Sequence, residues 1–144
     1  MLPRILSILL PLAGIAHFLV LFASFQVPAR LGWAEELPRL RPLNRKLMWT
    51  YGGFTVLTIV AFGMLTLLLR DEMLRGDKAA VALAAFIGVY WAARIGVDVF
   101  YFRHEDWPKG PGLILGHALL VMLFAFLALT YLGLVAWQLS GGRR

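Results

Sequence analysis

The chain has 144 residues, of which 60% are hydrophobic and only 15% are charged, against about a quarter charged in ordinary soluble domains. The apolar residues form long runs that leave no room for a soluble domain, so we expect a single polytopic membrane domain over residues 1–144. The absence of cysteine excludes disulfides, thiolate metal sites and a cysteine nucleophile. The net charge of +6 does not indicate a nucleic-acid partner, because nearly all Lys and Arg flank the apolar runs, where they meet lipid headgroups.

Four segments are long and apolar enough to cross a bilayer, which takes about 20 residues in a helix. They cover residues 5–26, 47–69, 79–102 and 113–139. The first begins like a secretory signal, but its apolar run is longer and no clean cleavage site follows, so we expect a retained span. Short connections between successive spans favour antiparallel neighbours. The sequence therefore predicts an all-α, up-down-up-down four-helix bundle in the membrane.

The connection between the first two spans, residues 27–46, is the longest, and we expect it to lie in the membrane interface. Within it, residues 33–37 are predicted to form a short interfacial helix, and Asn44 is the expected N-cap of the second span. An even number of spans puts both termini on the same side. Lys and Arg are divided almost equally between the two faces, so the sequence does not assign that side. The expected location is a bacterial inner membrane.

The third predicted span carries two charges, Arg94 and Asp98, inside an otherwise apolar run. An ionised side chain near the middle of a spanning helix costs about 3 kcal/mol on insertion scales, so these residues indicate a compensating environment inside the bundle. At about 100° per residue, they share a stripe with Ile87 and Trp91. A separate stripe of small residues predicts a close approach by another helix. Its members are Ala84, Gly88, Ala92 and Gly96.

The other three spans each contribute polar side chains: His17 in the first, a Tyr–Thr stripe in the second and His117 in the fourth. From a helical rise of about 1.5 Å per residue, all of them fall in the same half of the bilayer as the two charges. This agreement in depth across four helices predicts one polar pocket. Its predicted residues are Arg94, Asp98, His17, His117, Trp91, Tyr51, Thr55 and Ile87.

An apolar pocket with a few convergent polar groups is typical of small-molecule sites. We therefore predict that the protein binds an amphipathic lipid, quinone or isoprenoid, or is an accessory subunit of a membrane complex. Arg94 is expected to hold the polar head, and Trp91 and Ile87 to contact the ring or chain. The expected partners are the lipid bilayer, such a ligand, and a homo-oligomer or larger complex. No catalytic motif predicts an enzyme, and no cofactor is assigned.

Four alternatives stay open. His17 and His117 can serve as axial ligands of a b-type haem, with Arg94 paired to a propionate. Asp98 or a histidine can act as acid or base in a lipid-modifying enzyme, and the same groups can form a proton path. Finally, Arg94 and Asp98 can pair as i and i+4 neighbours in a purely structural bundle. Residues 104–106, His-Glu-Asp, indicate a solvated hinge more than a metal site.

Overall fold

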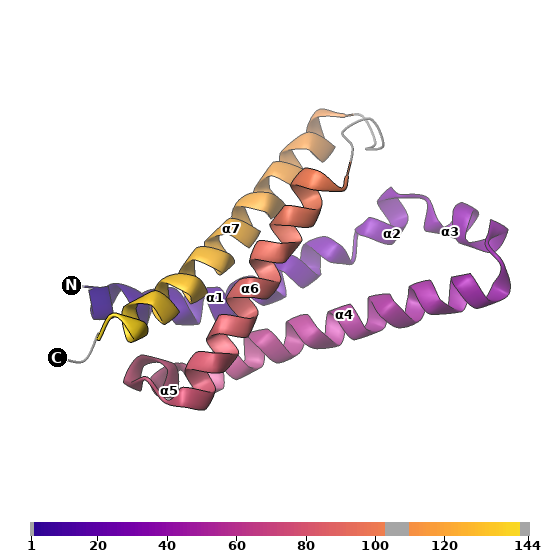
Figure 1. Cartoon of the computed structure of the whole chain (residues 1–144). Coiled ribbons are helices and arrows are strands. Elements are labelled where there is room, and N and C mark those ends of the chain that lie inside the picture. Colours follow the sequence, from indigo (N-terminus) through magenta and orange to yellow (C-terminus); the bar gives the residue numbers. More distant parts are fainter. Residues whose placement is uncertain (1, 103–109, 142–144) are drawn as a thin grey trace.

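The computed structural model describes residues 2–102 and 110–141, and every regular element within these ranges is helical. The four long helices are α1 (Leu2–Ser24), α4 (Pro42–Leu68), α6 (Lys78–Phe100) and α7 (Pro111–Leu139). They alternate in direction, so that α1 starts and α7 ends at the same end of the bundle (Figure 1). The predicted all-α, up-down-up-down bundle is confirmed. All four helices are long and apolar enough to span a membrane.

Shorter helices occupy the connections between the long ones. The expected short helix at residues 33–37 is present, but the expected N-cap at Asn44 is wrong. Arg41 holds the N-cap position and Pro42 the first turn of α4, where the missing N–H of proline costs nothing. The connecting elements are α2 (Val27–Arg30), α3 (Trp33–Glu36), the 3-10 turn η1 (Leu37–Arg39) and α5 (Arg70–Arg75).

The bundle is closed at one end and open at the other. α1 packs against both α4 and α7, and α7 packs against α6. Near the middle of the bundle, the ring of Phe62 on α4 lies 5.1 Å from that of Tyr90 on α6. From there the amino-terminal half of α4 diverges from α6 and α7 (Figure 1). The two helix pairs therefore meet near α5 and separate toward α2 and α3.

A pair of glycines brings α1 and α4 together. A Cβ atom on Gly63 would lie 2.9 Å from the ring of Phe18 and 3.0 Å from the carbonyl oxygen of Gly14. A Cβ on Gly14 would in turn lie 2.7 Å from the side chain of Leu67. Only residues without a side chain allow the two backbones to approach this closely, as is common where membrane helices cross.

The predicted stripe of small residues on α6 is used over half of its length. Ala84 and Gly88 are buried, and a Cβ on Gly88 would lie 2.8 Å from the side chain of Leu132 on α7. Ala92 is exposed, and a Cβ on Gly96 would meet nothing within 4 Å. The stripe therefore packs on α7 in the closed half of the bundle but leaves open space further along α6.

At the closed end, an arginine satisfies a backbone group that a proline leaves unpaired. Pro11 lies inside α1 and has no N–H, so the carbonyl of Ser7, one turn earlier, lacks its helical donor. The guanidinium Nη2 of Arg70 donates to that carbonyl oxygen at 3.0 Å. Gln138 of α7 donates to two carbonyl oxygens near the end of α5, at 2.8 and 3.0 Å. These contacts tie α1, α5 and α7 together.

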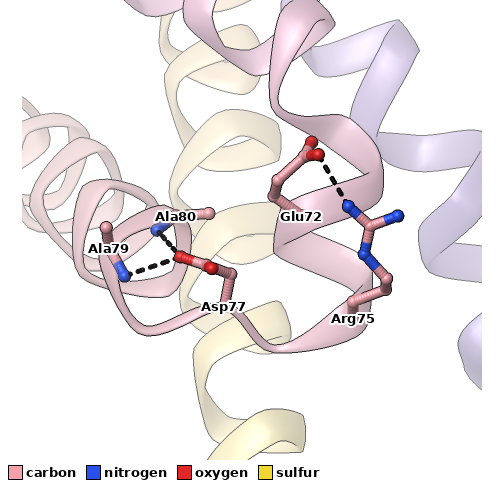
Figure 2. A network of polar contacts seen from close by, with 5 residues as sticks. All are labelled: Glu72, Arg75, Asp77, Ala79 and Ala80. Atoms are coloured by element: carbon pink, nitrogen blue, oxygen red, sulfur yellow. Dashed lines mark hydrogen bonds and ion pairs between the residues drawn. The ribbon is translucent and has the colours of Figure 1, made fainter.

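The turn from α5 into α6 is held by local polar contacts (Figure 2). The carboxylate of Asp77 caps α6 by accepting hydrogen bonds from the backbone N–H groups of Ala79 and Ala80. Beside it, Arg75 and Glu72 form an exposed ion pair of 2.7 Å. Exposed pairs of this kind contribute little, so the cap is the stronger determinant of where α6 begins.

Gly63→Ala is expected to destabilise the protein, because the added methyl group meets the backbone of α1, which cannot move aside. Overpacking of this kind typically costs about 1–3 kcal/mol. Gly53→Ala is the matched control on the same helix, since its Cβ would meet nothing within 4 Å. Thermal unfolding in detergent measures both. Equal melting temperatures for the two variants would contradict the close crossing of α1 and α4.

Candidate functional site

His17 lies at the centre of the bundle and has no exposed surface. Its Nδ1 is 2.7 Å from the carbonyl oxygen of Ala13, and the indole Nε1 of Trp91 is 3.1 Å from its Nε2. A carbonyl only accepts a hydrogen bond and an indole N–H only donates one, so Nδ1 carries the proton and Nε2 is the acceptor. The geometry thus specifies a neutral imidazole with both nitrogens engaged.

Aromatic rings from the other three long helices enclose His17. The ring centres of Phe62 on α4, Trp91 on α6 and Tyr131 on α7 lie 6.0, 5.6 and 5.8 Å from its own. The hydroxyl of Thr66 donates its proton to the carbonyl oxygen of Phe62, and the hydroxyl of Tyr131 lies 2.6 Å from the hydroxyl of Thr66. Because the single proton of Thr66 is already used, Tyr131 is the donor to Thr66. We call these five residues, His17, Phe62, Thr66, Trp91 and Tyr131, the central cluster.

The central cluster is packed core and not a ligand pocket. Ile87, the apolar end of the predicted pocket, has no exposed surface and belongs to the same core. His17, Trp91 and Ile87 therefore pack between helices, and neighbouring side chains fill the space beside each of them. The structure does not bring these three residues to an open space.

The residues present do not fit a haem held by His17 and His117. Coordination needs a free electron pair on a ring nitrogen, but Nε2 of His17 already accepts from Trp91 and Nδ1 donates to its own helix. A proton path through His17 would likewise require both hydrogen bonds to break. The described residues contain no group of three or more His, Cys, Asp or Glu that suits a metal, and residues 104–106 lie outside them.

Arg94 and Asp98 do not pair with each other. The Oδ2 atom of Asp98 lies 3.2 Å from Nε2 of His117 on α7, and the Asp98 side chain is only 9% exposed. The predicted i, i+4 ion pair is therefore wrong. Because α6 packs closely on α7, the short Asp98 side chain finds its partner on the neighbouring helix and leaves Arg94 without a carboxylate among the described residues.

The guanidinium of Arg94 lies against aromatic rings instead. Its Cζ is 5.5 Å from the ring centre of Phe124 and 5.7 Å from that of Phe102, within the range of about 6 Å for a cation–π interaction. Its Nη1 is buried and has no hydrogen-bond partner among the described residues. Leaving a charged donor unpaired away from water costs free energy, so an acceptor supplied from outside the chain would stabilise this arrangement.

Arg94 lines a cleft of about 480 Å³. The other lining residues come from the end of α1, from α2 and its flanks, and from the neighbouring ends of α6 and α7. Its other polar side chains are Gln26, Arg30 and His117, and none of its described lining residues is acidic. The rest of the lining is apolar side chains and glycine. The structure thus brings Arg94 and His117 together at one cleft, with Asp98 bound to the latter.

Tyr51 and Thr55 are not brought to this cleft. Tyr51 is 66% exposed, and the hydroxyl of Thr55 donates to the Tyr51 carbonyl of its own helix at 2.8 Å. Both lie on the amino-terminal half of α4, which diverges from α6 and α7 (Figure 1). The structure does not bring them to the cleft, because depth along the membrane fixes only one coordinate and the crossing of α4 with the other helices fixes the rest.

Comparisons of the chain with protein families, curated proteins and solved structures find no match. The cleft also includes two residues that the sequence does not predict for the pocket, Gln26 and Arg30. Gln26 ends the first predicted span, and Arg30 falls in the connection that is expected to lie in the interface. The length of the first apolar segment could have indicated them. The apolar segment continues from α1 through α2 as a candidate span, Leu2–Arg30, and Gln26 and Arg30 are one helical turn apart at its end.

Trp91→Phe keeps an aromatic ring in the central cluster but removes the indole N–H, which leaves Nε2 of His17 buried without a donor. We expect the free energy of unfolding to fall by about 1–3 kcal/mol. Trp49→Phe, at a 55% exposed position, is the control and is expected to change it little. Denaturant titration in detergent is the measurement.

Combining Trp91→Phe with His17→Leu tests the hydrogen bond directly in a double-mutant cycle. Hydrogen bonds between membrane helices give coupling energies of about 0.6 kcal/mol on average and about 1.7 at most. A coupling in that range is the expected result. Strictly additive losses would show that the bond between Trp91 and His17 does not contribute to stability.

Proposed function

We propose that this protein binds an amphipathic small molecule from the lipid phase, namely a lipid, quinone or isoprenoid, in the cleft between α2 and the ends of α6 and α7. One observation carries the proposal. The Arg94 guanidinium lines the cleft, and one of its nitrogens is buried without a hydrogen-bond partner among the described residues. A carbonyl, hydroxyl or phosphate oxygen of the ligand would supply the acceptor.

The size and lining of the cleft support this proposal. Small-molecule sites typically enclose about 300–1,000 Å³ and are largely apolar, with a few polar groups that fix orientation. The cleft has about 480 Å³ and presents apolar side chains such as Leu113 and Leu120 next to Arg94 and His117. The apolar part of the ligand would lie against the leucines, while its head would face the two nitrogen-bearing side chains.

The setting of the cleft agrees with a ligand that partitions into membranes. Its lining includes residues of three apolar helices of spanning length, α1, α6 and α7. We propose a bacterial inner membrane as its location, since helical spans are typical there and outer membranes mainly hold β-barrels. The diverging half of α4 exposes large apolar side chains, among them Trp49 and Phe54. Lipid, a second copy of the chain or another subunit would cover these side chains. Cover by another subunit would agree with an accessory role in a membrane complex.

One observation favours a second candidate function, acid–base chemistry on the bound ligand. His117 lines the cleft, and Asp98 holds its Nε2 at 3.2 Å. A carboxylate that orients an imidazole is a common arrangement for a general base. A ligand whose mass changes on incubation with the wild type but not with His117→Gln would favour this function. A ligand recovered unchanged from both would favour binding alone.

Arg94→Gln is expected to reduce ligand retention, because glutamine keeps a polar side chain but loses the charged donors. A hydrogen bond from a charged group contributes about 1.5–3 kcal/mol, which corresponds to a loss of about ten- to a hundredfold in affinity. Native mass spectrometry in mild detergent, with a panel of a short-chain ubiquinone, a polyprenol and phospholipids, measures occupancy.

Arg39→Gln is the matched control for this experiment. It removes the same charge from an exposed position in η1, outside the residues that line the cleft. We expect it to retain ligand like the wild type. Equal occupancy of every probe in wild type and Arg94→Gln would contradict the proposed function.

A further inference from the structure

Two arginines on different elements line the same cleft, and their charges are not compensated by the described residues. Arg94 comes from α6, and Arg30 comes from α2. From these charges we propose that the ligand's polar head is an anionic phosphate group on a membrane-soluble chain, clamped between Arg30 and Arg94. This inference rests on the proposed function and narrows its ligand class.

Neither arginine has a carboxylate partner among the described residues. The ion pairs there join Arg75 to Glu72 and His117 to Asp98, so the carboxylate nearest in sequence to Arg94 is already engaged. The hydrogen bond of Arg30 goes to the neutral amide oxygen of Gln26, at 3.3 Å. Two positive charges that face one largely apolar cleft repel each other, and an anion between them relieves that repulsion.

A phosphate suits this geometry better than a neutral head. A quinone carbonyl accepts a hydrogen bond but brings no charge, so it would leave both guanidinium charges uncompensated. A phosphate has several acceptor oxygens and carries the opposite charge, so it can bind Arg30 and Arg94 at once, and guanidinium groups match phosphate oxygens in a planar fork. The apolar lining, including Leu113 and Leu120, would then take the first part of the chain.

Binding of two lipids with identical chains tests the inference in mild detergent: dioleoyl phosphatidic acid, which carries the phosphate, and dioleoylglycerol, which lacks it. We expect wild type to bind phosphatidic acid at least about tenfold more tightly, the effect of one charged hydrogen bond. Arg30→Gln and Arg94→Gln are each expected to lower that preference about tenfold. Equal affinity of wild type for the two lipids would overturn the inference.

Two further arms identify the source of the phosphate and the role of charge. Millimolar inorganic phosphate is expected not to displace phosphatidic acid, since it lacks the chain, and displacement would overturn the assignment to a membrane-soluble ligand. Arg30→Lys keeps the charge but not the planar fork, so it is expected to restore part of the preference lost in Arg30→Gln. Arg30 is exposed, and within residues 2–102 and 110–141 its side chain bonds only to Gln26, which makes its substitution compatible with folding.

The variants also separate this inference from the proposed function. If Arg94→Gln weakens binding of dioleoylglycerol or short-chain ubiquinone while Arg30→Gln has no effect on any probe, the phosphate clamp is wrong and the proposed function stands. If neither variant changes the binding of any probe, both fail. Arg39→Gln is the charge control and is expected to bind phosphatidic acid like the wild type.

Discussion

The hydrogen bond from Trp91 to His17 is the constraint on which the rest of the bundle depends. Within a membrane no water is available to satisfy a buried polar group, so each one must find a partner in the chain. His17 meets this requirement with its own helix on one nitrogen and with α6 on the other. The central cluster adds Phe62 and Tyr131, so one residue fixes the rotation of all four long helices.

That rotation also places the cleft. Arg94 follows Trp91 by nearly one helical turn, so fixing the indole sets the direction of the guanidinium. The ring of Phe124 is stacked on Trp91, with 4.9 Å between centres, and the Arg94 guanidinium lies over the same ring at 5.5 Å. Phe124 therefore contacts both the indole of the packed core and the guanidinium that lines the cleft.

The sequence predicts the fold well because long apolar runs and short connections leave few arrangements for four helices. It predicts the site only in part. Arg94 and His117 are predicted in the same half of the bilayer and do share the cleft, whereas Tyr51 is predicted in that half too but lies on the part of α4 that diverges. Hydropathy and the helical rise predict how deep a residue lies in the membrane. Its lateral position depends on how the helices cross, as α1 and α4 do at Gly14 and Gly63, and such crossings depend on contacts between residues far apart in the chain.

The difference between the two ends of the bundle explains how a cleft can exist in so small a protein. At the α5 end, glycine crossings and the bond from Arg70 to Ser7 hold the helices together. At the other end, α4 diverges and α7 begins with glycines in place of large side chains, which leaves space beside Arg94. Because the central cluster satisfies its own polar groups, the proposed ligand would enter and leave the cationic cleft without opening the core. Stability and the proposed binding would thus depend on different residues of the same helices.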